Sequence, residues 1–168
     1  MDLLARREYS RHELQSKLIR AFSRKTSMYP VAQDKEDGDS GVHGDTVARA
    51  ASLEQIIANQ VTLLVDENLQ SDDRFVESFI NGRRAKGHGP DKIRRDLRQK
   101  SVSEVLVERY LDECDEQWLE LARRVYQKKF GDKGPKDYRE KAKRWRFMQM
   151  RGFPHGLIEA LLVIDECE

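Results

Sequence analysis

The chain has 168 residues, of which 36% are charged and 38% are hydrophobic, and its formal net charge is +1. This length allows about one domain, and the charged content predicts a thin apolar core beneath a charged surface, as long amphipathic helices give. Two cysteines without a shared motif argue against a disulfide scaffold and favour a reduced, cytoplasmic protein, while no apolar run approaches the roughly 20 residues that cross a bilayer.

A first helical repeat is expected over residues 1–70. Ser10 precedes an amphipathic helix, and Glu13 follows at the spacing of a capping box. The segment at about 24–44 is polar and rich in glycine and aspartate, which predicts an exposed, mobile loop inserted into this repeat. Another helix follows the loop. Its expected apolar side is formed by Ile56, Ile57, Val61, Leu64 and Val65.

A second repeat is expected over residues 71–113. Its first helix should end before Gly87, which suits a C-terminal cap, and Pro90 suits the first turn of the next helix. A third helix should begin with an N-cap and a hydrophobic staple. The cap is Ser103, and the staple residues are Val102 and Val107.

A third repeat, residues 114–168, resembles the second at an offset of 51 positions, which places Phe153 at the position of Val102. Gly152 is expected to end a long basic helix just before this staple residue. A period of this size predicts stacked helical units. The predicted fold is therefore all-α, with three tandem three-helix repeats in an elongated, curved array whose shared surface carries the function.

Charge is distributed unevenly along the chain. Residues 83–100 hold eight basic and two acidic side chains, and residues 123–151 hold twelve and three, whereas 34–77 and 104–120 are acidic. Two interpretations are open: a solvated face with ion pairs between repeats, or a positive stripe that meets an anionic partner. The candidate partner-binding residues are Arg83, Arg84, Lys86, Arg94, Arg95, Arg98, Lys128, Lys129, Lys141, Lys143, Arg144, Arg146 and Arg151.

No catalytic, cofactor or metal site is expected. The four histidines are scattered and lack ligand spacing with either cysteine, and no P-loop motif is present. The acidic pair Asp72-Asp73 stands at an expected helix start, where the helix dipole accounts for it. Tyr138 and Trp145 lie among the basic residues, where aromatics can stack on bases, although we expect Trp145 to lie inside. The sequence thus favours a binding protein over an enzyme.

Four stretches of the chain resemble the RecX family, bacterial regulatory proteins that act on the RecA recombinase filament. They read LARREYSRHELQSKL at 4–18, LQSDDRFVESFINGR at 69–83, KAKRWRFMQMRGF at 141–153 and GLIEALL at 156–162. Together they cover all three repeats in order. The chain departs from the family pattern where the segment 24–50 splits the first repeat. The second repeat also has Ser101 where the third has Gly152.

The resemblance implies a non-enzymatic protein of tandem three-helix repeats that binds in the groove of the RecA–DNA filament. It further implies inhibition of RecA ATPase, strand exchange and coprotease activity, in recombination, DNA repair and the SOS response. A monomer with weak direct contact to DNA is expected. The residues leave one alternative open, a helical protein that binds DNA directly through its basic stripe, with an affinity that falls steeply with salt.

Overall fold

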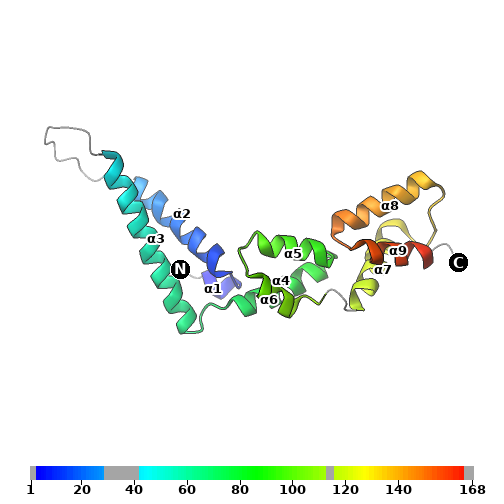
Figure 1. The fold of residues 1–168 in the computed structure, drawn as a ribbon, viewed down its shortest axis with the longest axis horizontal. Helices are drawn as coiled ribbons and strands as arrows, with labels where there is room; N and C mark the ends of the chain where they lie inside the picture. The colour runs from blue at the N-terminus through cyan, green and yellow to red at the C-terminus, as the bar shows by residue number, and fades with distance from the viewer. Residues whose placement is uncertain (1–2, 29–41, 113–115, 165–168) are drawn as a thin grey trace. The chain divides into compact units, whose positions relative to one another are not determined.

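A computed structural model describes residues 3–28, 42–112 and 116–164, and every regular element in these ranges is helical. The all-α prediction is therefore confirmed, and Figure 1 shows the helices in chain order. Their bounds are α1 Leu3–Arg6, α2 Arg11–Met28, α3 Val42–Asp66, α4 Asp72–Ala85, α5 Pro90–Arg98, α6 Glu104–Tyr110, α7 Gln117–Phe130, α8 Tyr138–Arg151 and α9 His155–Ile164.

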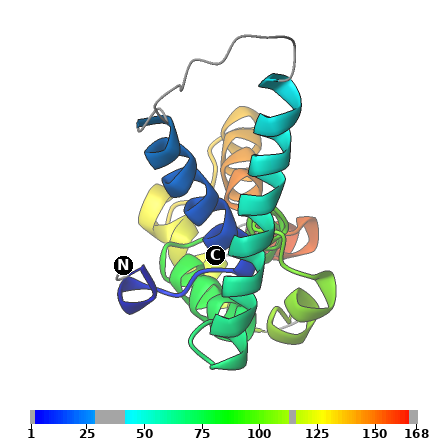
Figure 2. The same cartoon turned by 90° about the vertical axis from the view of Figure 1, so that its left-hand side faces the viewer.

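The described chain divides into two compact units, Met1–Asp72 and Asp73–Glu168. The first unit is built on α2 and α3, which lie side by side in two perpendicular views (Figure 1, Figure 2). The predicted cap is present, because the Ser10 hydroxyl accepts a hydrogen bond of 3.1 Å from the backbone N–H of Glu13. The core of this unit is formed by Tyr9, Leu14, Ile57 and Val61.

Two expectations for the first unit need correction. Helix α2 continues to Met28 and α3 begins at Val42, so both ends of the segment predicted as a loop are helical. The rest of that segment, residues 29–41, lies outside the described residues. Ile56 was expected inside but is 55% exposed. Helix α3 packs mainly on one partner, α2, so it buries a narrower stripe than its apolar residues suggest.

The second unit holds two three-helix groups, α4–α6 and α7–α9 (Figure 1). One continuous hydrophobic core runs through both, with Ile93 and Val107 from the first group and Trp118 and Met148 from the second. All four residues of the two predicted staples are buried in this core, as a staple requires. They are Val102, Val107, Phe153 and Ile158. The tandem-repeat prediction thus holds here, and the curvature of the array stays a prediction.

The helix ends in the second unit follow the expected turn chemistry. Gly87 and Gly152 have φ values of +73° and +85°, the left-handed conformation of a helix C-terminal cap. Ser101 adopts the same conformation with φ of +54°, and the N–H of Val102 bonds the carbonyl of Leu97 at 3.3 Å. The second repeat therefore makes with serine the turn that the third makes with glycine. A side chain in this conformation is strained.

A backbone joint connects the two repeats of the second unit. The N–H of Gly89 donates to the carbonyl of Arg151 at 2.9 Å, and the N–H of Asp91 donates to the carbonyl of Gly152 at 3.1 Å. A Cβ atom at Gly89 would collide with the Gly152 carbonyl, and one at Gly152 would collide with the backbone of Lys92. Because the two turns touch through main-chain atoms, the repeats keep a fixed register, which positions the side chains described next.

Candidate partner-binding site

Three of the five candidate arginines of α4 and α5 are held by acids of their own repeat. Arg83 pairs with Asp96 at 3.2 Å and lies over the Phe79 ring. Arg94 and Arg98 both bind Glu104, which Arg98 contacts through Nε at 2.8 Å. A paired cation attracts an external anion less than a free one, because its field is already compensated nearby. The second repeat therefore presents less positive charge than its sequence suggests.

Glu104 is the residue that sequence reasoning overlooked here. It occupies the first turn of α6 directly after the Ser103 cap, a position that the helix dipole favours for an acid. The hydrogen bond from Arg98, with further contribution from Arg94, lowers the pKa of Glu104. Arg95 differs from its neighbours, because it is exposed and has no ion-pair partner within the described ranges.

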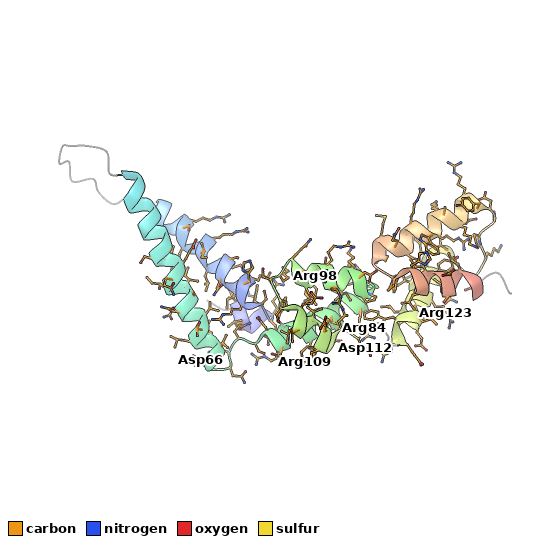
Figure 3. All side chains as sticks on the ribbon, in the orientation of Figure 1. Asp66, Arg84, Arg98, Arg109, Asp112 and Arg123 are labelled. Atoms are coloured by element: carbon orange, nitrogen blue, oxygen red, sulfur yellow. The ribbon has the colours of Figure 1, made fainter. Side chains whose placement is uncertain are left out.

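At the junction of the two repeats, two candidate arginines connect helices. The Nη2 of Arg84 donates to the Gln117 side chain at 3.0 Å, and its guanidinium lies 4.4 Å from the centre of the Trp118 ring. The Nη1 of Arg151 donates to the backbone carbonyl of Lys86 at 3.1 Å. Figure 3 labels Arg84 on α4. Both side chains are therefore ordered by the protein itself.

These residues surround a cleft of about 420 Å³ between α4, α7 and α8, which we call the inter-repeat cleft. Three lysines are exposed along it: Lys86, which directly follows α4, and Lys128 and Lys129 in the last turn of α7. Its floor is apolar. The full lining is Arg84, Ala85, Lys86, Gly87, Leu121, Arg124, Val125, Lys128, Lys129, Phe147 and Arg151.

Arg124 lines this cleft but was not among the candidates. It is exposed and stands one helical turn before Lys128 on α7. The i, i+4 spacing places both side chains on one face of the helix. That spacing was visible in the sequence and could have identified Arg124.

Arg144 was a candidate partner-binding residue, but the structure places its side chain in the interior. It is only 3% exposed, and it donates to the Tyr126 hydroxyl and the Lys133 carbonyl at 2.7 Å each. It also binds Glu140 at 2.8 Å, and this hydrogen bond, followed by one from the backbone of Lys136, lowers the pKa of Glu140. The charge of Arg144 therefore stabilises the turn between α7 and α8 and is not presented to a partner.

The remaining candidates lie on α8. Lys143 and Arg146 are exposed beside a second, more open groove, and Lys141 is half-buried. Tyr138, which lines the same groove, is 86% exposed. Trp145 was expected inside; it packs against the core but is only half-buried, with its ring 4.6 Å from that of His155.

The described helices include none long and apolar enough to cross a membrane. Within the same residues, no group of three or more His, Cys, Asp or Glu side chains is placed to hold a metal ion. Both cysteines lie outside the described ranges.

Comparison with known proteins agrees with this architecture. The model of the third three-helix domain of RecX matches residues 115–162, and that of the second matches residues 71–111, which are the two repeats around the inter-repeat cleft. The regulatory protein RecX of Pseudomonas syringae pv. tomato is 36% identical over 96% of this chain and 86% of its own length. That of Serratia proteamaculans is also 36% identical, over 96% of this chain and 92% of its own length. Similarity of this extent, with both repeats in register, shows that the chain belongs to the RecX family of regulatory proteins.

Proposed function

We propose that the protein binds the RecA–DNA filament and inhibits RecA ATPase, strand exchange and coprotease activity. This would place it in the cytoplasm, in recombination, DNA repair and the SOS response, and it would act without chemistry of its own. The observation that carries the proposal is the similarity to proteins named regulatory protein RecX over 96% of the chain. The family resemblance suggests the RecA filament as the partner, and the basic residues suggest that electrostatic attraction brings the two together.

The proposed contact surface is narrower than the set of thirteen candidates. Its cations are the exposed ones with no ion-pair partner in the described part of the chain. These side chains can approach an anionic filament without first breaking an internal pair, so they steer association. They are Lys86, Arg95, Lys128, Lys129, Lys143 and Arg146.

A second candidate function, direct DNA binding, has one observation in its favour. Tyr138 is 86% exposed, and Arg139, Lys143 and Arg146 line the same groove of α8. An exposed ring among cations can stack on an unpaired base. Each phosphate neutralised would lower log affinity by about 0.7 per log unit of salt on a single strand.

Co-sedimentation and ATPase assays test the proposal together. We expect the protein to sediment with filaments formed from RecA, single-stranded DNA and an ATP analogue, and far less with either component alone. In parallel it should slow DNA-dependent ATP hydrolysis by RecA. The variant Tyr138→Ala separates the two functions, because it removes the ring that would stack on a base in the α8 groove and leaves all six cations of the contact surface in place. Wild-type protein that neither sediments with filaments nor slows hydrolysis would overturn the proposal.

A further inference from the structure

We infer that the inter-repeat cleft is a docking site for an acidic peptide segment that carries an apolar side chain. The inference rests on the proposed function in one respect, because we take that segment to belong to the protein partner, RecA. The cleft itself lies within the second unit and is formed by the two repeats that the backbone joint at Gly89 and Gly152 holds in register. It is therefore present before any partner arrives.

Charge is the first argument. Six cations line the cleft, and no acidic side chain is among its lining residues. Lys86, Arg124, Lys128 and Lys129 reach solvent without an ion-pair partner in the described ranges. The other two, Arg84 and Arg151, are ordered by stacking on Trp118 and Phe147. Preorganised guanidinium groups suit carboxylates, which they bind through paired hydrogen bonds.

The floor of the cleft is the second argument. Leu121 is buried, and Val125 and Phe147 are half-buried and pack against the hydrophobic core. The cleft therefore combines a basic rim with an apolar base. A partner with only charged side chains would leave this apolar floor exposed to water, whereas one aliphatic or aromatic side chain would cover it.

The geometry favours a peptide over a nucleic acid. Each aromatic ring nearby has a guanidinium group over it, Arg84 over Trp118 and Arg151 over Phe147. A base would have to compete with these groups to stack on a ring here, whereas the Tyr138 ring in the α8 groove is 86% exposed.

Fluorescence anisotropy with a labelled peptide tests the inference on the full chain. The probe is a short peptide of aspartate and glutamate with one central leucine, and a matched peptide has serine in place of leucine. We expect the leucine peptide to bind at least about threefold more tightly than the serine peptide. A single-stranded oligothymidylate of similar length, added unlabelled, should not displace it.

Arg123 and Arg124 provide a matched pair of variants. They are adjacent on α7 and both exposed, but only Arg124 lines the cleft; Arg123 is labelled in Figure 3. Arg124→Glu should weaken peptide binding about fivefold, whereas Arg123→Glu, with the same charge change, should alter it less than about twofold. Adding Lys128→Glu and Lys129→Glu should weaken binding about a hundredfold in total, if each reversal contributes about the same factor. Circular dichroism and thermal unfolding verify that each variant folds.

Three results would overturn the inference: no peptide binding by wild-type protein, equal weakening by the two arginine variants, or displacement of the peptide by oligothymidylate. Equal affinity for the leucine and serine peptides would overturn the part of the inference that gives the segment an apolar side chain. Because this assay contains no RecA, its failure leaves the proposed function standing. Conversely, peptide binding without filament co-sedimentation would overturn the proposed function but support the inter-repeat cleft as a peptide-docking site.

Discussion

The second and third repeats both contain a basic stretch, yet they use it differently. In the second repeat, Arg94 and Arg98 converge on Glu104, and Arg83 pairs with Asp96. In the third, Lys128 and Lys129 extend from the end of α7 without such a partner among the described residues. Net charge along a sequence therefore does not measure the charge that a partner meets. What matters is whether an acid of the same repeat lies within reach.

The two repeats also differ in how their second helix ends. The third uses Gly152 in the left-handed conformation, and the second uses Ser101. The glycine is required twice, once for its backbone angle and once because the backbone of Lys92 lies against it. The serine faces solvent and meets only the conformational requirement. Substitutions at these positions should therefore have effects of opposite sign.

Gly152→Ala is expected to have the largest effect. A left-handed alanine costs about 1–2 kcal/mol, and the collision with Lys92 forces a shift of the joint that costs about 1–3 kcal/mol more. Urea denaturation should show a loss near 3 kcal/mol. Gly82→Ala is the control, because nothing lies within 4 Å of that position in α4, and it should stabilise by about 0.5–1 kcal/mol. Equal stability of Gly152→Ala and wild type would mean that the two turns do not touch.

Arg144→Met should be the next most damaging change. It keeps the approximate volume but leaves the Tyr126 hydroxyl and two loop carbonyls without their donor, at a cost of about 2–4 kcal/mol. The exposed neighbour supplies the control, since Lys143→Met should change stability by less than about 0.5 kcal/mol. If Arg144→Met retained full thermal stability but lost filament binding, Arg144 would be a contact residue after all.

The two repeats also show which features of the structure could be predicted from the sequence. The staples at Val102 and Phe153 and the caps at Ser103 and Gly87 were predictable, because each depends on neighbours a few positions away. The burial of Arg144 was not, since its partners in the turn, the carbonyls of Lys133 and Gly134, come together only when α8 folds back on α7. The inter-repeat cleft needs contacts between residues more than 30 positions apart, such as Arg84 with Gln117. Periodicity carries no information about such pairs.

Ser101→Gly should raise stability modestly. Glycine removes the strain of a left-handed serine, about 1–2 kcal/mol, but adds unfolded-chain entropy that offsets part of this. We expect a net gain of about 0.5–1 kcal/mol, measured as a higher midpoint of thermal unfolding. Ser101→Ala tests the cause, because it keeps a side chain in the strained conformation and should bring no such gain. A destabilised Ser101→Gly protein would show that the serine makes a contact that outweighs its strain.

Glu104→Gln should have the smallest effect on stability. It should also make the second repeat resemble the third in the positive charge that it presents to a partner. The carboxylate pKa lies below its ordinary value of 4.5, chiefly because Arg98 donates to it. A depressed folded-state pKa stabilises the protein above that ordinary value and ceases to do so as the pH falls through the folded-state pKa. The variant should therefore be slightly less stable than wild type near neutral pH, and the difference should vanish in acid. Meanwhile the negative charge beside Arg94 and Arg98 is removed, so the second repeat becomes more positive and filament co-sedimentation should strengthen, most clearly at low salt. If binding instead weakens together with stability, the ion pairs around Glu104 position the contact surface and do not mask it.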